Sequence, residues 1–221
     1  MSLLEQFCQE MQPLLKGKDS VHGAVSVCAS YEEAGREVAQ LLRDRQLRRV
    51  IAAARSELDP ALSSLQETLA RLEVEEPTGA PMALQRENDT EAKLGDSSFT
   101  FHEYAEFDAG IGGADVLIAE SATLGLRMGA LESRALSLLP PTHIVIAPAS
   151  RLVARIHDAL EGPFAYLNPR ESTSDDEPEA PGSSPTLTFI TGPSRTADIE
   201  KILVLPAHGP SQLFVWLVSE A

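Results

Sequence analysis

Residues 107–126 read FDAGIGGADVLIAESATLGL, and this stretch decides the fold class. A glycine-rich approach leads into the apolar run Val116–Ala119, which is typical of a buried strand, and a polar turn begins at Glu120. A further short strand is expected over Thr123–Arg127. Polar residues directly after a buried strand are typical of α/β proteins, whose ligand crevice lies at the carboxyl ends of the strands.

Helices and strands alternate on the amino-terminal side of this stretch. Apolar residues at helical spacing, with capping residues before them, predict helices over residues 2–15, from Ser30 to about Asp44, and from Asp59-Pro60 onward. Short apolar runs predict strands over residues 21–29 and 50–54.

The carboxyl-terminal side continues the alternation. Strands are expected over residues 135–139, 143–148, 186–191 and 213–218. A helix is expected from Ser150 to a stop at Gly162-Pro163, and another helical start at Ala197. The whole pattern predicts an α/β fold with a mostly parallel sheet and helices on both faces.

We expect a single domain over residues 1–221 with two weakly patterned segments. Residues 73–106 lack clear periodicity, and we expect them to form a loose acidic excursion. Residues 168–185 read NPRESTSDDEPEAPGSSP and offer too little apolar surface to offset the entropy of ordering, so we expect a disordered loop there.

Composition excludes several classes of protein. The net charge of −15 and an aromatic content of 5% disfavour binding to nucleic acid, and the acidic surface disfavours binding to anionic membranes. No apolar run is long enough to cross a bilayer, and Glu5 and Glu10 interrupt any signal-peptide core, so we expect a cytoplasmic protein without membrane insertion. The only cysteines are Cys8 and Cys28, and no CxxC or HExxH spacing occurs, so we expect no metal site. No motif names a cofactor.

Two polar turns that follow strands are the candidate site for a small anion. Backbone N–H groups, hydroxyls and one guanidinium in such turns can hold a carboxylate or a phosphate. The expected ligand contacts are Ser121, Thr123, Thr191, Gly192, Ser194, Arg195, Thr196 and His208, and Glu120 is the candidate catalytic carboxylate.

Each of these residues also has a structural interpretation. Arg195 can pair with Asp198 or Glu200, and His208 can simply fix its loop. Glu120 can be a glutamate exposed beyond a strand end, or it can pair with Arg127 or Arg134. Asp108 and Asp115 flank the glycine run and are expected to shape that turn.

Three blocks, at residues 108–126, 133–153 and 187–210, resemble the LUD domain family, and the size of the chain is similar to lactate utilisation protein C. The resemblance implies a fold similar to the NagB/RpiA/CoA transferase-like superfamily. It also implies a role in oxidising L-lactate to pyruvate beside iron–sulfur protein partners. One departure is Ser121-Ala122, where the family pattern has a Thr-Gly pair.

Three functions stay open at this point. The first is an accessory or ligand-binding component of an L-lactate utilisation system that works with iron–sulfur lactate utilisation proteins. The second is a self-sufficient enzyme on a small anionic substrate, such as a sugar phosphate, an acyl-CoA or a folate derivative, with Glu120 as the superfamily carboxylate. The third is a structural scaffold. The residues leave open whether the chain is catalytic on its own.

Overall fold

A computed structural model describes residues 1–16, 22–75, 83–86, 101–128, 134–164, 186–193, 196–197, 203–204 and 209–219. The helices are α1 (Leu3–Leu14), α2 (Tyr31–Asp44), α3 (Asp59–Glu75), α4 (Phe101–Tyr104), α5 (Arg134–Leu138) and α6 (Ile156–Glu161), with 3₁₀ turns η1 (Ser56–Leu58), η2 (Ala119–Ser121) and η3 (Ala149–Arg151). The disordered loop expected at 168–185 lies outside the described residues.

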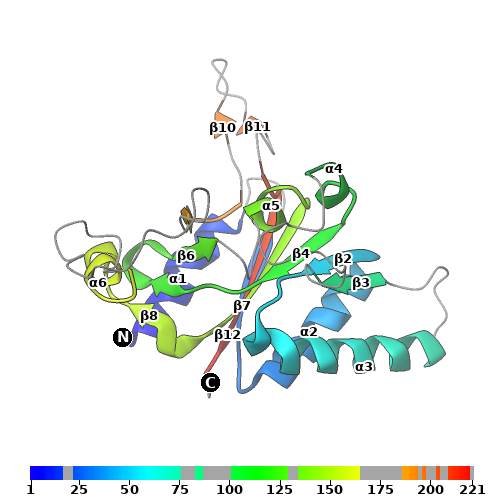
Figure 1. Ribbon diagram of the computed structural model, residues 1–221. Helices are drawn as coiled ribbons and strands as arrows, with labels where there is room; N and C mark the ends of the chain where they lie inside the picture. The colour runs from blue at the N-terminus through cyan, green and yellow to red at the C-terminus, as the bar shows by residue number, and fades with distance from the viewer. Residues whose placement is uncertain are drawn as a thin grey trace, which may run out of the picture.

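The main sheet has six strands in the order β1-β12-β7-β4-β2-β3, and all five pairings are parallel (Figure 1). Its strands are β1 (Gly23–Cys28), β2 (Arg49–Ala52), β3 (Ala83–Arg86), β4 (Ala109–Gly112), β7 (Thr142–Pro148) and β12 (Gln212–Val218). The expected parallel α/β architecture is therefore confirmed.

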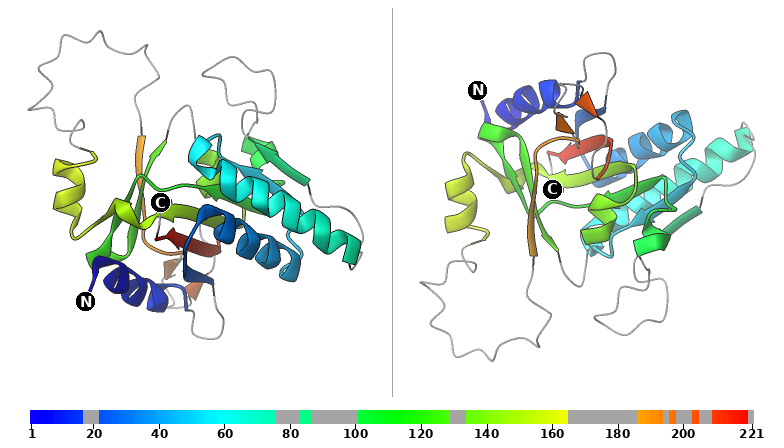
Figure 2. Two further views of the ribbon diagram at one scale, coloured as in Figure 1. Left: turned by 90° about the horizontal axis from the view of Figure 1, so that it is seen from below. Right: turned by 90° about the horizontal axis from the view of Figure 1, so that it is seen from above.

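Both faces of the central strands are buried, as a parallel sheet requires. Along β12, Phe214 and Trp216 belong to the core that α2 and α3 cover, while Leu213 and Val215 belong to the core that contains α1. Figure 2 shows α2 and α3 side by side, well away from α1. The α2–α3 contact is close because Gly35 has no side chain: a Cβ there would lie 2.1 Å from the Ala61 carbonyl oxygen.

A second, four-stranded sheet lies over the α1 face of the main sheet. Its order is β8-β5-β6-β9, from β8 (Leu152–Val153), β5 (Val116–Ile118), β6 (Thr123–Met128) and β9 (Thr186–Ile190). A small antiparallel ribbon pairs β10 (Thr196–Ala197) with β11 (Leu203–Val204) and projects from the body in Figure 1.

The structure corrects three expected elements. Residues 135–139 were expected to form a strand, but α5 is a helix, because a short apolar run does not distinguish the two. The helix expected from Ser150 begins only at Ile156, since η3 and β8 occupy the preceding residues. The helical start expected at Ala197 is instead the strand β10.

The expected excursion over 73–106 also differs where it is described. Helix α3 continues to Glu75, and β3 joins the main sheet as an edge strand beside β2. The short helix α4 precedes β4. The described part of this segment is thus built into the fold. Among the described helices, none combines the length and the apolar content that a membrane span needs.

Candidate functional site

Charged side chains converge where three parallel strands of the main sheet end. Arg55 follows β2, Asp115 follows β4, and Arg151 lies in η3 directly after β7. These strands are neighbours in the order β7-β4-β2, so their carboxyl ends open onto one edge of the sheet. This is the edge at which open α/β sheets form ligand crevices.

Two arginine–carboxylate pairs make up this group, which we name the arginine–carboxylate cluster: Arg55, Glu57, Asp115 and Arg151. Arg55 donates from Nη1 and Nη2 to the two Asp115 carboxylate oxygens, at 3.1 and 2.8 Å. Arg151 donates from Nη1 and Nη2 to the two Glu57 oxygens, at 2.8 and 2.5 Å. Both pairs therefore have the bidentate geometry that makes guanidinium–carboxylate contacts strong and directional.

The backbone supports the cluster on two sides. The Ala114 carbonyl oxygen accepts from Arg151 Nη1 at 2.6 Å, and Asp115 Oδ2 accepts from the Arg127 N–H at 2.6 Å. Gly113 leaves room for the side chains, because a Cβ there would lie 2.9 Å from Glu57 Oε1. The glycine-rich approach to β5 thus fits against the charged groups.

The contacts within the cluster favour the charged forms of Asp115 and Arg151. Burial by itself raises the pKa of Asp115, but the hydrogen bonds and charge of Arg55 outweigh that effect, so the pKa lies below its usual value. The hydrogen bond to Glu57 raises the pKa of Arg151. Burial and the nearby Glu57 charge raise the pKa of Tyr31, whose phenol therefore stays protonated at neutral pH. Arg151 keeps 27% of its side chain exposed, so it remains within reach of solvent.

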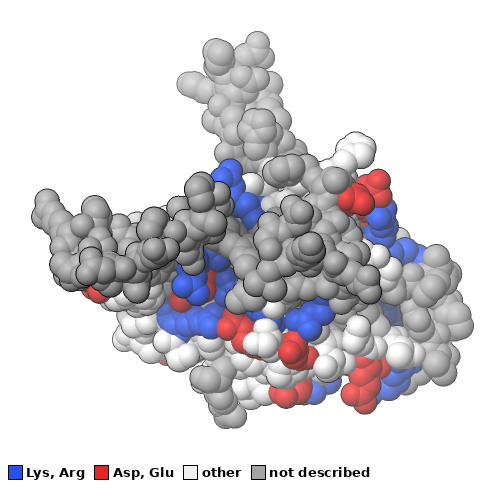
Figure 3. Space-filling view, viewed as in Figure 1, with Lys and Arg blue, Asp and Glu red and all other residues white. Residues whose placement is uncertain are grey.

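Opposite charges are interspersed on the visible face of the molecule. Figure 3 shows blue and red side chains next to one another rather than a patch of one sign. Among the described residues, no group of three or more His, Cys, Asp or Glu side chains is placed to hold a metal ion.

Glu120, the candidate catalytic carboxylate, lies in η2 and is exposed. Its Oε1 accepts from the Ile156 N–H at 3.1 Å, so the carboxylate satisfies one of the open donors at the start of α6. Its exposure and this backbone contact fit the interpretation of Glu120 as a glutamate beyond a strand end, and its catalytic role stays a prediction.

Three of the expected contact residues share a chain of hydroxyl groups. Thr123 Oγ1 lies 2.8 Å from Ser121 Oγ and 2.6 Å from Thr191 Oγ1. The two polar turns, 68 residues apart in sequence, therefore meet. Between Ser121 and Thr123, Ala122 has φ 47° and ψ 46°, a left-handed conformation that favours glycine. That conformation accounts for the glycine of the family pattern at this position.

The rest of the second turn is only partly described. Gly192 has φ 96°, which a glycine adopts without strain, and its position lies against Leu14 of α1. Thr196 lies in β10. Ser194, Arg195 and His208 lie outside the described residues, so their expected contacts stay predictions.

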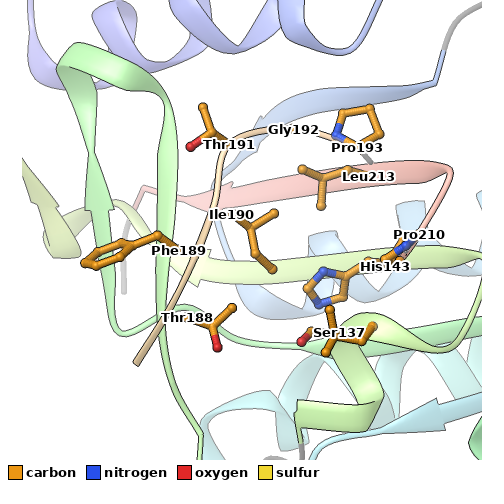
Figure 4. Close-up of a pocket in the computed structure, with 12 residues that line it drawn as sticks. Ser137, His143, Thr188, Phe189, Ile190, Thr191, Gly192, Pro193, Pro210 and Leu213 are labelled. Carbon is orange, nitrogen blue, oxygen red and sulfur yellow. The ribbon is translucent and has the colours of Figure 1, made fainter. Parts of the chain in front are cut away.

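A cavity of about 240 Å³ adjoins Thr191 and Gly192 (Figure 4). It lies near the amino-terminal ends of β7 and β12, since His143 and Leu213 are the second residues of these strands. The His143 side chain is 1% exposed, and neither ring nitrogen has a hydrogen-bond partner among the described residues.

The sequence interpretation missed both the arginine–carboxylate cluster and His143. Asp115 was expected to shape its turn, and its partner Arg55 is 60 residues away in the chain, so no local pattern connects them. One signal was present: Arg55, Asp115 and Arg151 each lie within three residues after the end of a short strand. His143 gave a weaker signal, as a histidine inside an otherwise apolar run.

Known proteins resemble this chain in sequence. A model of the LUD domain matches residues 14–218. An uncharacterised protein of Neisseria meningitidis is 33% identical over 147 residues, which cover 66% of this chain and 54% of that protein. Lactate utilization protein C of Shouchella clausii is 40% identical over 110 residues, 49% of this chain and 43% of that protein. The protein of the same name from Oceanobacillus iheyensis is 32% identical over 120 residues, 54% of this chain and 46% of that protein. The matched stretches thus span about half the length of these curated relatives.

A solved structure supports the fold. The crystal structure of a DUF162 family protein from Deinococcus radiodurans superposes with a TM-score of 0.60 and 21% sequence identity, covering 98% of this chain and 96% of that one. At this identity the likeness concerns the fold alone.

Proposed function

This chain belongs to the LUD domain family, and from that premise we propose that it serves an L-lactate utilisation system as a component that binds a small carboxylate anion. Iron–sulfur lactate utilisation proteins are the proposed partners. The names of the relatives support the pathway, and the arginine–carboxylate cluster supports the binding of an anion.

The observation that carries the proposal is the position of Arg151. Its guanidinium lies at the carboxyl edge of a parallel sheet, is partly exposed, and is already oriented by Glu57 and the Ala114 carbonyl oxygen. An oriented guanidinium binds a planar carboxylate with little loss of side-chain entropy. The protonated phenol of Tyr31, which interacts electrostatically with Arg151, is a further proposed donor.

The cysteines support a division of labour. Burial, with Glu37 and Glu33 nearby, raises the pKa of Cys28 to about 11, and burial also raises the pKa of Cys8. Both thiols therefore stay protonated at neutral pH, whereas thiol redox chemistry uses the thiolate. We propose that the electrons of lactate oxidation are carried by the partners.

The two polar turns are the second proposed contact region. The hydroxyl chain of Ser121, Thr123 and Thr191 supports it, and Gly192, Ser194, Arg195, Thr196 and His208 complete the proposed set. A catalytic role for Glu120 belongs to the alternative function, a self-sufficient enzyme on a small anion. The contact from Glu120 to Ile156 favours the first function over this one.

Isothermal titration of the purified chain with L-lactate and with pyruvate tests the proposal. Arg151→Gln should weaken the binding of either anion by about tenfold or more, the scale of one lost charge-assisted contact. Arg36→Gln, an exposed arginine on α2, is the matched control and should leave affinity unchanged. No binding by the wild-type chain, or equal loss in both variants, would contradict the proposed anion site.

The cellular part of the proposal needs a separate test. The host gene is replaced by the wild type, by Arg151→Gln or by Glu120→Gln, and growth on L-lactate is compared with growth on glucose. We expect a lactate-specific defect for Arg151→Gln and normal growth for Glu120→Gln. Normal growth on lactate after complete deletion of the gene, in a host without a second system, would exclude the pathway.

A further inference from the structure

The cavity at the amino-terminal end of β7 and β12 is separate from the arginine–carboxylate cluster. His143 is the second residue of β7, whereas Arg151 follows the last residue of the same strand, so the two regions lie at opposite ends of the sheet. The walls come from β9 and the turn after it, from the end of α5, and from the start of β12 (Figure 4). Nothing proposed above uses this cavity apart from its rim at Thr191 and Gly192.

His143 gives the cavity its only titratable group among the described residues that line it. Burial lowers the pKa of His143 to about 4, so the ring is neutral at physiological pH. A neutral imidazole presents one N–H donor and one acceptor nitrogen. Neither has a partner among the described residues, although buried polar atoms are almost always paired.

The other walls are mostly apolar. Leu138, Phe189, Ile190, Pro193 and Leu213 face the cavity. Leu138 and Phe189 remain 38% and 40% exposed, so apolar surface is accessible at the rim. The hydroxyl of Ser137 is already used, because it donates to the Arg134 carbonyl oxygen at 3.1 Å.

We propose that this cavity is a second binding site, for a small uncharged molecule with a short apolar body and a polar head that both donates and accepts hydrogen bonds, as a primary amide or an alcohol does. The head pairs with the His143 ring, and the body lies against the apolar walls. A volume of about 240 Å³ lies below the range of sites that hold drug-sized ligands, so it suits a small molecule.

The described walls favour an uncharged occupant over an anion. No described lining residue is cationic, and a neutral imidazole cannot offset the cost of removing a carboxylate from water.

Two nearly isosteric probes, propionamide and propionate, test the proposal because they differ in charge. The ring nitrogens of His143 are followed by ¹⁵N NMR in the wild-type chain at pH 7. Propionamide should shift these signals in a saturable manner, and propionate should do so much more weakly. No saturable shift with propionamide, or a stronger effect of propionate, would overturn the proposal.

Variants locate the binding. His143→Leu should weaken propionamide binding about fivefold or more, the effect of losing the hydrogen bonds of the head. Ser137→Ala, in the same wall, should leave binding within about twofold, since its hydroxyl is engaged inside α5. Equal binding by His143→Leu and the wild type would place the probe elsewhere. Arg151→Gln should not change the affinity for propionamide. The test of this cavity is therefore independent of the test of the proposed lactate site.

Discussion

The two ends of the parallel sheet treat buried polar groups in opposite ways. At the carboxyl end, a buried Arg55 and a partly buried Asp115 are charged and joined by two hydrogen bonds. At the amino end, His143 is uncharged, more deeply buried and without a partner among the described residues. Arg55 and Asp115 bond to each other, whereas the His143 ring has hydrogen-bonding capacity that the described residues do not use.

The difference separates two sources of specificity. Paired charges fix side-chain orientation, so a ligand at the carboxyl end meets groups that are already positioned. An unpaired neutral ring selects a ligand by what that ligand supplies, because only a molecule with the missing donor or acceptor relieves the cost of burial. Substitutions at one end of the sheet should therefore affect stability independently of substitutions at the other end.

The largest effect is expected from Asp115→Asn. Removing this charge leaves Arg55 buried beside a weaker partner, Glu57, which lies 3.6 Å away. Breaking a buried pair from one side costs about 3–5 kcal/mol of unfolding free energy, measured by urea denaturation. Asp44→Asn, at an exposed carboxylate on α2, is the control and should change stability by less than about 0.5 kcal/mol.

The same variant has a pH signature. Because the pKa of Asp115 is lowered in the folded state, its contribution to stability is present above the usual aspartate pKa and is lost as the pH falls below it. The stability difference between wild type and Asp115→Asn should therefore shrink in acid. A difference that stays constant down to about pH 2 would show that Arg55 does not depend on this charge.

The next effect is acid destabilisation through His143. The folded ring has a pKa of about 4, against a usual value of 6.5, so the unfolded chain gains a proton before the folded one does. Stability from this group is complete above pH 6.5 and falls by about 3 kcal/mol as the pH drops toward 4. His143→Leu should remove this slope from the urea midpoint between those values, and an unchanged slope would contradict the burial of a neutral ring.

A smaller effect is expected from Glu57→Gln at the carboxyl end. Glu57 and Arg151 each keep 27% of their side chains exposed, so solvent screens the charge that the variant leaves unpaired. The loss should be about 1 kcal/mol, well below that of Asp115→Asn. Equal losses of unfolding free energy for the two variants would mean that burial does not determine which of the two ion pairs contributes more to stability.

The smallest effect is expected from Thr123→Val. Thr123 is buried and connects Ser121 to Thr191 through its hydroxyl, so the variant leaves two partly exposed hydroxyls that water can reach. Thermal unfolding should show a loss of about 1 kcal/mol. A much larger loss would mean that the hydroxyl chain holds the two turns together.

Local patterns predicted most of the fold. The capping box of Ser2 and Glu5 is present at the start of α1, and Ser30 accepts from the Glu33 N–H at the start of α2. The strands β1, β2, β5, β6, β7, β9 and β12 appear where apolar runs indicated them. The misassigned segments are α5, the residues between Ser150 and Ile156, and β10. They are short runs, and periodicity does not decide the conformation of so few residues.

The site was less predictable than the fold. The pairing of Arg55 with Asp115 depends on how β2 and β4 become neighbours, which is tertiary information. That the His143 ring has no partner among the described residues depends on tertiary packing, which the sequence does not show. The meeting of Thr123 with Thr191 was implied only by the expectation that both turns belong to one site.

The position of β12 has a consequence for how the molecule assembles. This last strand of the described chain lies inside the sheet, between β1 and β7, and the Cys28 thiol contacts the Leu217 carbonyl oxygen 189 residues away. Until β12 arrives, β1 has no partner in the sheet, and both core faces lack the side chains of β12. Such long-range parallel pairing is slow to form. During synthesis, the nascent chain would therefore carry an open sheet edge until β12 is made, and such an edge is prone to aggregation.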